Sequence, residues 1–478
     1  MSVAPPPGAD LRTWLDHLQR TDRLAVARPG AALRHGVAAV ANRLDGTAAT
    51  LFPAPDGHPV PVLAGVLGAR SWVAEALGVG DDALLERFER ATREPVPCTE
   101  IDTAPCQDVL HREVDLTRLL PVPTHNEHDH GPYITAGLLV SRRPGTGVQN
   151  VAIHRLQVSG PDRLGALLLP RHTLEFFDDA EARGEDLPVA VVIGNDPITL
   201  LASQAIVPVD HDELEIAGAL RGSPLPVTRC VTNDIRVPAG AEIVVEGRLL
   251  AGTREPEGPF GEFPQYYGPR AERHVIAVDA VTHRHEPIFH TIVGGGGEHL
   301  LLGAVPREAS FLSHLRRSFP SVRDLHLSRG GACRYHLAVQ LDKGSEGEAR
   351  NVILGALAVH YDVKHVVVVD TDVDVHDPAE VEWAVATRFQ ADRDLVVVPG
   401  AQGSKLDPSA DGGVGAKMGL DATVPLAAEP MRFARIRVPG EEQIDPATAV
   451  SPAAPSWRED LARRVAGQVP TLPSSAGE

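Results

Sequence analysis

Two carboxylates stand five residues apart in a loop-forming segment, EGPFGE at residues 257–262. On a helix, side chains five residues apart point in different directions, whereas a Gly-Pro loop allows both to turn toward one point. Paired carboxylates in unequal surroundings differ in pKa, so that one stays ionised while the other delivers a proton. The segment therefore indicates acid–base chemistry at Glu257 and Glu262, with a solvated acidic turn as the alternative.

An arginine stands in an otherwise strand-like segment, NVAIHRLQVS at residues 150–159. In a continuous strand, Val151, Ile153 and Arg155 share one face. A buried arginine requires an anionic partner, whereas an arginine on an edge strand is simply solvated. From the residues alone, both interpretations of Arg155 stay open.

Three separated residues offer ligands for a divalent cation. Asn150, His172 and Glu213 supply an amide oxygen, an imidazole and a carboxylate, a set that suits Mn²⁺ or Mg²⁺. The chain has 21 histidines, so spacing alone does not single out this set.

Three other segments resemble functional motifs in their composition. The run HNEHDH at 125–130 resembles a metal loop but lacks the spacing of helical ligands, and we expect a His-rich surface loop instead. Lys405 and Lys417 stand among glycines, which fits an anion contact or a subunit contact. The run GGGGE at 294–298 matches no nucleotide-binding pattern.

Length and composition restrict the class of protein. The chain has 478 residues, of which 43% are apolar and 23% charged, so we expect a globular protein of two or three domains. A net charge of −19 disfavours nucleic acid and anionic membranes as partners. Four cysteines without a CxxC pair exclude a zinc ribbon and fit a reducing compartment. With no signal-peptide or membrane-span pattern, we expect a cytoplasmic protein.

The predicted elements change character along the chain. Apolar spacing indicates helices at 10–23, capped by Asp10, and near 70–78 and 81–92. From 133 to about 295, runs rich in Val and Ile predict a β-barrel or curved sheet, interrupted by a helix in DELEIAGALRG. From about 300, helices and strands alternate as in a separate α/β unit. A last helix near 456–467 places Trp457, Leu461 and Val465 where they could dock on a partner subunit.

Taken together, these segments resemble the UbiD family of prenylated-FMN-dependent decarboxylases and carboxylases. The resemblance runs from roughly 100 to 425, and its order and spacing make it specific. It rests on GPYITAG, the NxxxxR pattern at 150–155, His172, Ser203 ten residues before Glu213, EIAGALRG, EGPFGEF, DVDVHDPAEVEWAVATRF and KMGLDAT.

The resemblance implies a mixed α/β fold and a set of cofactors. The implied domains are an N-terminal α/β unit (1–105), a split β-barrel that binds flavin and metal (106–298), and a C-terminal α/β domain with an oligomerisation tail (299–478). The implied cofactors are prenylated FMN, Mn²⁺ or Mg²⁺, and K⁺. Asn150, His172 and Glu213 match the metal ligands. The implied catalytic residues are Arg155, Glu257 and Glu262. The implied cofactor-binding residues are Asn150, Ala152, Ile153, Arg155, Arg171, His172, Ser203 and Glu213.

The resemblance also implies a reaction. It is the reversible, non-oxidative decarboxylation of an aromatic, heteroaromatic or α,β-unsaturated carboxylic acid, with the flavin as electron sink and Glu262 as proton donor. A flavin prenyltransferase would supply the cofactor, and the chain would form homodimers or hexamers. Glu298 and His299 are candidates for substrate contact, against core or surface roles. The alternatives are a flavin- or metal-dependent hydrolase or oxidoreductase, and a non-catalytic flavin-binding protein.

Overall fold

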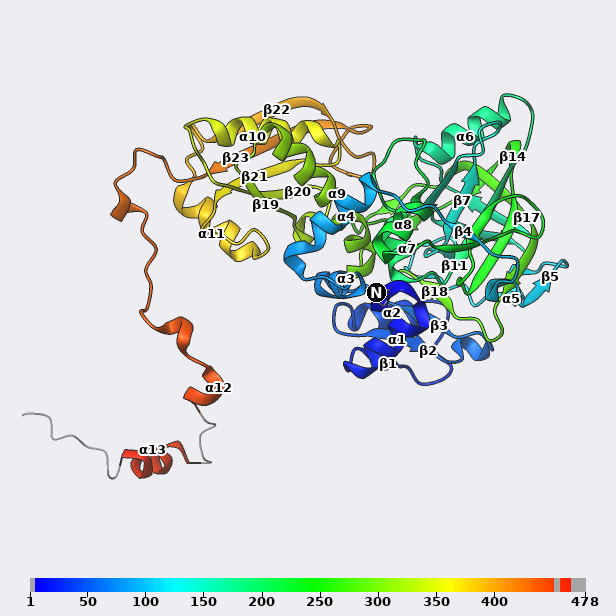
Figure 1. The fold of residues 1–478 in the computed structure, drawn as a ribbon, viewed down its shortest axis with the longest axis horizontal. Coiled ribbons are helices and arrows are strands. Elements are labelled where there is room, and N and C mark those ends of the chain that lie inside the picture. Colours follow the sequence, from blue (N-terminus) through cyan, green and yellow to red (C-terminus); the bar gives the residue numbers. More distant parts are fainter. Residues whose placement is uncertain (1–4, 451–455, 466–478) are drawn as a thin grey trace, which may run out of the picture. The chain divides into compact units, whose positions relative to one another are not determined.

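The computed structural model describes residues 5–450 and 456–465. The chain divides into two units, Met1–Thr423 and Val424–Glu478. The first unit holds every candidate site residue and is built from three segments in succession, which follow the colours of Figure 1 from blue to orange.

The first segment is a small α/β layer. As predicted, Asp10 caps α1 (Leu11–Arg20), since its carboxylate accepts a hydrogen bond from the Thr13 N–H at 2.9 Å. The helix buries Leu11, Trp14, Leu15 and Leu18 and ends at Arg20, three residues earlier than predicted. The other helices are α2 (Gly36–Arg43), α3 (Arg70–Ala76) and α4 (Leu84–Arg93), the last two close to their predicted positions.

The sheet of this layer is completed from a distant part of the chain. Its strand order is β1 (Leu24–Val26), β2 (Ala49–Phe52), β3 (Val62–Ala64) and β18 (Phe289–Thr291). Because β18 pairs in parallel with β3, residues that follow the strand-rich segment return to the N-terminal layer before the third segment begins.

The second segment confirms the predicted strand-rich region. Its nine-stranded sheet runs in the order β6-β9-β10-β17-β14-β11-β7-β8, with β5 paired to β17. The long pair β14 and β17 curves strongly in Figure 1. The strands are β5 (Val109–His111), β6 (Tyr133–Ile134), β7 (Leu138–Arg142), β8 (Gln149–Ile153), β9 (Leu156–Gly160), β10 (Arg163–Ala166), β11 (Leu187–Ile193), β14 (Ile243–Glu257) and β17 (Ala271–His283).

Smaller elements flank this sheet. The helix in DELEIAGALRG forms as predicted: Asp212 caps α8, and Gly222 ends it in the left-handed region at φ +74°. The helices are α5 (Leu116–Leu119), α6 (His172–Glu181), α7 (Pro197–Ala202) and α8 (Glu213–Arg221). The remaining strands are β4 (Thr99–Glu100), β12 (Pro226–Arg229), β13 (Arg236–Pro238), β15 (Phe260–Gly261) and β16 (Tyr267–Gly268).

One predicted strand is wrong in its continuity. The segment 150–159 breaks after Ile153 into β8, which pairs with β7, and β9, which pairs with β6 and β10. Arg155 therefore lies in the link between two strands rather than on one face with Val151 and Ile153. The break has a tertiary cause, because the two halves pair near opposite ends of the sheet.

The third segment confirms the predicted α/β unit. Its sheet has the order β19-β20-β21-β23-β22, and β21 is a run of valines buried on both faces. Val366 and Val368 pack with the core of α10, while Val367 and Val369 pack with that of α11. The elements are α9 (Gly297–Ser318), β19 (Val322–Leu327), β20 (His336–Leu341), α10 (Glu348–Val359), β21 (His365–Asp370), α11 (Pro378–Arg388), β22 (Leu395–Gln402) and β23 (Val414–Ala422).

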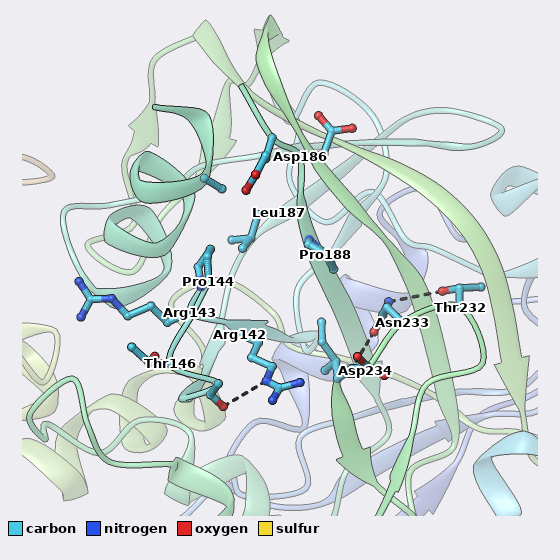
Figure 2. Close-up of a pocket in the computed structure, with 15 residues that line it drawn as sticks. Arg142, Arg143, Pro144, Thr146, Asp186, Leu187, Pro188, Thr232, Asn233 and Asp234 are labelled. Carbon is cyan, nitrogen blue, oxygen red and sulfur yellow. Dashed lines mark hydrogen bonds between the residues drawn. The ribbon is translucent and has the colours of Figure 1, made fainter. Parts of the chain in front are cut away.

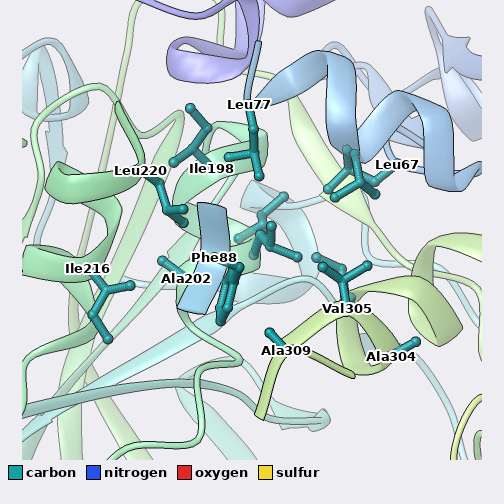
Figure 3. Packing of buried hydrophobic residues seen from close by; sticks show 14 of the residues in the cluster. Leu67, Leu77, Phe88, Ile198, Ala202, Ile216, Leu220, Ala304, Val305 and Ala309 are labelled. Carbon is teal, nitrogen blue, oxygen red and sulfur yellow. The ribbon is translucent and has the colours of Figure 1, made fainter. Parts of the chain in front are cut away.

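A shared apolar core joins the three segments. Figure 3 shows Phe88 of α4 among side chains from α7, α8 and α9. Burying a side chain of this size stabilises the fold by roughly 2–3 kcal/mol. The packing fixes α8, which begins at Glu213, relative to α9, which carries Arg307. The labelled side chains are Leu67, Leu77, Phe88, Ile198, Ala202, Ile216, Leu220, Ala304, Val305 and Ala309.

The second unit contains α12 (Pro446–Ala449) and α13 (Trp457–Val465). The helix predicted near 456–467 is present as far as Val465, and residues 466 and 467 lie outside the described ranges. Trp457, Leu461 and Val465 are 60%, 55% and 45% exposed, and their docking on a partner subunit stays a prediction. No helix within 5–450 or 456–465 is long and apolar enough to cross a membrane.

Candidate active site

Arg155 holds the two carboxylates of the EGPFGE segment together. Its Nη2 donates to Glu257 Oε2 at 2.8 Å, and its Nη1 donates to the Glu262 carboxylate. Glu257 ends β14, Glu262 follows the short strand β15, and the Gly-Pro turn between them directs both side chains to the guanidinium. The three side chains are 7%, 0% and 11% exposed, in the order Arg155, Glu257 and Glu262, so this is a buried ion-pair network.

Glu257 has further partners that the sequence did not reveal. The Tyr133 hydroxyl lies 3.1 Å from Glu257 Oε1 and 3.1 Å from Gln157 Oε1. Burial and the neighbouring Glu257 charge raise the pKa of Tyr133, so the hydroxyl stays protonated and donates. Tyr133 and Gln157 face each other across the β6–β9 pair. Glu257 thus accepts from two donors, Arg155 and Tyr133, one on each carboxylate oxygen.

Glu262 has a different environment. It is the more exposed of the two carboxylates, and its one side-chain partner within the described ranges is Arg155. Gly268 of β16 lies directly against this pair: a Cβ there would stand 3.0 Å from Arg155 Nη1 and 3.3 Å from Glu262 Oε1. A glycine at this position therefore leaves room for the ion pair, a requirement that no sequence pattern indicated.

The HNEHDH segment contacts the loop at 257–262, which carries Glu257 and Glu262 and which we call the carboxylate loop. Asp129 Oδ1 accepts the Gly261 N–H at 2.8 Å, and the His130 N–H donates to Pro259 O at 3.0 Å. His125 is buried against Thr291, and burial lowers the pKa of His125 to about 4. Among the residues that the structure describes, no group of three or more His, Cys, Asp and Glu could hold a metal ion. The segment positions the loop that carries Glu262.

Asn150, His172 and Glu213 converge on β8. His172, the first residue of α6, places Nδ1 3.2 Å from Asn150 Oδ1. Glu213, the first residue of α8, accepts the Val151 N–H at 2.8 Å. Burial raises the pKa of Glu213 to about 8. Glu213 has no cationic partner within residues 5–450 and 456–465, and it contacts the residue that follows Asn150. A buried carboxylate in this position fits a divalent cation, which would favour its ionised form.

The remaining cofactor candidates are placed unequally. Ala152 and Ile153 continue β8 beyond Asn150 and are half-buried, and Arg171 is the exposed residue that precedes α6. Ser203 is buried at the end of α7, where its hydroxyl donates to Leu200 O at 2.7 Å. In the described part of the chain, the Ser203 side chain has no recorded contact with any other proposed cofactor-binding residue.

The segment that follows β18 splits into two environments. Glu298 is 3% exposed, accepts the Gly65 N–H at 2.9 Å and pairs with His290, so it has a core role. His299 instead lies beside Phe263, with ring centroids 6.5 Å apart. His299, in α9, therefore lies against the residue that directly follows Glu262.

A surface hollow of about 700 Å³ lies elsewhere. Figure 2 shows that it is bordered by the β7–β8 connection, the start of β11 and the turn that includes Asn233. None of the candidate catalytic, metal or cofactor residues lines it. The hollow is therefore separate from the candidate active site.

Comparison with known proteins gives matches over most of the chain. Residues 99–297 match the 3-octaprenyl-4-hydroxybenzoate carboxy-lyase Rift-related domain (UbiD). Residues 15–92 and 300–422 match the N-terminal and C-terminal domains of the same carboxy-lyase. An anhydromevalonate phosphate decarboxylase of Methanothermobacter thermautotrophicus is 42% identical over 370 residues, which cover 77% of this chain and 86% of the relative.

Solved structures agree with this result. The UbiD-class enzyme HmfF from Pelotomaculum thermopropionicum, in complex with FMN, superposes with a TM-score of 0.91 and 49% identity. The match covers 92% of this chain and all of that one. An evolved dimeric form of the same enzyme, in complex with prFMN, gives a TM-score of 0.87 and 46% identity over the same shares.

Proposed function

Because the chain belongs to the UbiD family and is a carboxy-lyase of that type, we propose which acids it acts on and how its residues act. The substrate is an aromatic, heteroaromatic or α,β-unsaturated carboxylic acid, and the reaction is a reversible, non-oxidative decarboxylation that depends on prenylated FMN. The observation that carries the proposal is the buried contact of Arg155 with two carboxylates in unequal surroundings. Family membership favours this reaction over the hydrolase, oxidoreductase and non-catalytic alternatives.

Each residue of the network has a separate task in this proposal. Prenylated FMN, when bound, supplies the electron sink for the charge that the departing CO₂ leaves on carbon. Arg155 orients both carboxylates and balances their charge. Glu257 stays ionised because Arg155 and Tyr133 donate to it. Glu262, with fewer donors and more exposure, takes up a proton and delivers it to the carbon that lost CO₂.

The cofactor site is proposed beside this network. Asn150, His172 and Glu213 would hold Mn²⁺ or Mg²⁺, which would neutralise the flavin phosphate, and K⁺ would bind nearby. Ala152, Ile153, Arg171 and Ser203 line the flavin, and the curved nine-stranded sheet is the split barrel that contains it. The complexes of the HmfF relative with FMN and with prFMN support flavin binding by this chain.

The wider assignments are also proposals. The M. thermautotrophicus relative is named for anhydromevalonate phosphate, so phosphorylated acids belong among the substrates to be tested. The evolved HmfF form is dimeric, which supports a homodimer, and hexamers are the alternative. A flavin prenyltransferase supplies the cofactor.

The proton-donor role is tested with Glu262→Gln, made alongside a flavin prenyltransferase without oxygen. Mass spectrometry should find prenylated FMN at the wild-type ratio per chain. CO₂ release and solvent-deuterium exchange into the product should be lost, because the amide cannot deliver the proton. Glu255→Gln, at the end of β14 and paired with Arg163 at the surface, is the matched control. Full activity of Glu262→Gln would refute the role of Glu262.

The cation site is tested with Glu213→Gln, which keeps the shape of the side chain and removes its charge. We expect loss of both Mn²⁺ and flavin from the purified protein, measured by elemental analysis and absorbance. Retention of both at wild-type ratios would contradict the proposed ligand set. Wild-type protein that binds only plain FMN and releases no CO₂ from any acid would contradict the proposed function as a whole.

A further inference from the structure

Buried arginines with an incomplete set of anionic partners lie beside the carboxylate loop. Arg307 comes from α9 and Arg334 from the turn before β20, and the two side chains are almost fully buried. Arg171, which precedes His172, is close enough that its charge acts on both. We call Arg171, Arg307 and Arg334 the arginine cluster.

The hydrogen bonds of the cluster leave its charge uncompensated. Arg307 Nη1 donates to Gly303 O at 2.8 Å within its own helix, and its Nε has no hydrogen-bond partner in the described part of the chain. Arg334 Nη1 donates to the carbonyl oxygens of Cys333 and Leu300, at 2.9 and 3.4 Å. These acceptors carry no formal charge, so neither guanidinium forms a direct ion pair through these bonds.

Asp362 is the carboxylate nearest to these cations among the contacts of the described residues. Its Oδ2 forms a long ion pair with Arg307 Nη2, at 3.9 Å and beyond hydrogen-bond distance. Its charge also acts on Arg334 and on Lys417, which is buried in β23 and donates to Leu357 O. Arg307, Arg334 and Lys417 thus share the charge of Asp362. Keeping unpaired charges buried costs several kcal/mol, a cost that a bound anion would offset.

The neighbouring histidines add neutral donors rather than further charge. Burial and the nearby arginines lower the pKa of His299 and of His360 to about 4, so both are neutral at pH 7. The Gly295 N–H donates to His299 Nδ1 at 3.2 Å, which places the remaining proton on Nε2. His299 is therefore a hydrogen-bond donor at the edge of the cluster. Burial and mutual repulsion also lower the pKa of Arg307 and Arg334.

The cluster adjoins the proposed active site on two sides. Phe263, directly after Glu262, has its ring 5.3 Å from the Arg334 guanidinium carbon. On the other side, Arg171 precedes the proposed metal ligand His172. An acid whose reacting end lies at Glu262 would therefore extend its far end toward Arg334 and Arg307.

The backbone of α9 leaves space for the Arg334 guanidinium at Gly303. A Cβ at Gly303 would stand only 1.5 Å from Arg334 Nη2, so any side chain there would displace it. The shared apolar core around Val305 and Ala309 holds α9 in place. The position of Arg334 is thus fixed by packing before any ligand binds, which reduces the entropy lost on binding.

We propose that the arginine cluster is an anion subsite of the substrate pocket, and that the substrate carries a second anionic group besides the carboxylate that leaves as CO₂. This rests on the proposed function and narrows its substrate class to dianionic acids. The second group is a carboxylate or a phosphate, because a guanidinium matches both with paired N–H donors.

The test compares matched ligands on flavin-loaded protein by calorimetry, at constant ionic strength and without turnover. One series is benzoate, terephthalate and 4-carboxyphenyl phosphate, and the other is crotonate, glutaconate and 4-phosphonooxycrotonate. We expect the second anionic group to tighten binding by about 10-fold or more. Tighter binding of the dicarboxylates assigns a carboxylate to the subsite, and tighter binding of the phosphate esters assigns a phosphate.

Two variants locate the effect. Arg334→Met keeps the apolar stem and removes the charge, and it should abolish the preference for the second anion while keeping the flavin. Without added anions it should melt no lower than wild type, because it relieves repulsion between buried cations. Sulfate or inorganic phosphate should raise the melting temperature of wild type more than that of the variant. Arg317→Met, at an exposed position on α9, should match wild type throughout.

Several results would overturn the proposal. Equal binding of mono- and dianions, or identical responses of wild type and Arg334→Met to every anion, would show that the cluster binds no anion. Loss of flavin from Arg334→Met would assign the cluster to the cofactor phosphate instead. Because none of these measurements needs turnover, they stay decisive if the protein releases no CO₂, which would refute the proposed function separately.

Discussion

Replacing Tyr133 with phenylalanine removes one hydroxyl from the carboxylate network and leaves no cavity. Both Tyr133 and Glu257 are completely buried, so water does not replace the lost donor. The hydroxyl has one proton and two acceptors at 3.1 Å, Glu257 and Gln157. The ionised Glu257 is the stronger acceptor, and Gln157 Oε1 still accepts the Gly258 N–H at 3.1 Å after the change.

The size of the effect follows from this environment. A hydrogen bond to a charged group contributes about 1.5–3 kcal/mol, and the buried acceptor left behind is not resolvated. We therefore expect Tyr133→Phe to lower the free energy of unfolding by about 1.5–3 kcal/mol. The rate constant kcat should fall by about 10-fold or more, because Glu257 then depends on Arg155 alone for its orientation.

The assay is denaturant unfolding together with steady-state CO₂ release, for Tyr133→Phe, Glu257→Gln and the double variant. A coupling energy of about 1–3 kcal/mol between the two sites would confirm a direct bond. Tyr266→Phe changes an exposed side chain between β15 and β16. Its free energy of unfolding should stay within about 0.5 kcal/mol of the wild-type value. A Tyr133→Phe protein with wild-type stability and no coupling to Glu257 would refute the reasoning.

Two further changes test the supports around the site. Burial alone would raise the pKa of Glu308, but its ion pair with Arg70 lowers that pKa from 4.5 to about 2. Glu308→Gln should therefore cost about 3 kcal/mol at pH 7, measured by denaturant unfolding. The cost should shrink as the pH falls below 4.5 toward 2, because the stabilisation exists only while the buried carboxylate is ionised; an undiminished cost at low pH would count against the ion pair. Asp129→Asn should lower kcat and stability by weakening the hold on Gly261, whereas a match to the exposed control Glu127→Gln would argue against that role.

The local elements were within reach of the sequence because their causes are local. Asp10 and Asp212 cap helices through bonds to residues two or three positions away, and Gly222 ends a helix through its own backbone freedom. The alternation of helices and strands in the third segment was also predicted from the sequence pattern. The family resemblance named the candidate site residues, since their order along the chain carries that information.

Other features depended on contacts between distant segments. The break after Ile153 was missed because both halves have strand propensity, and only their pairing with different neighbours separates them. The start of α9 at Gly297 also depends on a distant residue, because Asp45 accepts the first helical N–H at 2.9 Å. In both cases, the local sequence does not indicate which distant segment will be the partner.

The carboxylate loop contains both kinds of feature, those predicted from the sequence and those that depend on tertiary contacts. Its composition indicated that Glu257 and Glu262 could converge, because glycine and proline allow the turn. The identity of their partners was decided in three dimensions, by Tyr133 across a strand pair and by the missing side chain of Gly268.

The arginine cluster belongs wholly to the tertiary structure. Arg171, Arg307 and Arg334 are ordinary residues in an arginine-rich chain, and nothing in their spacing connects them. Whether a charge is compensated depends on which groups lie within a few ångströms and on how much water is excluded. Those are properties of the folded arrangement, so the sequence determined which charges exist, and the tertiary structure alone decided which of them are left without a partner.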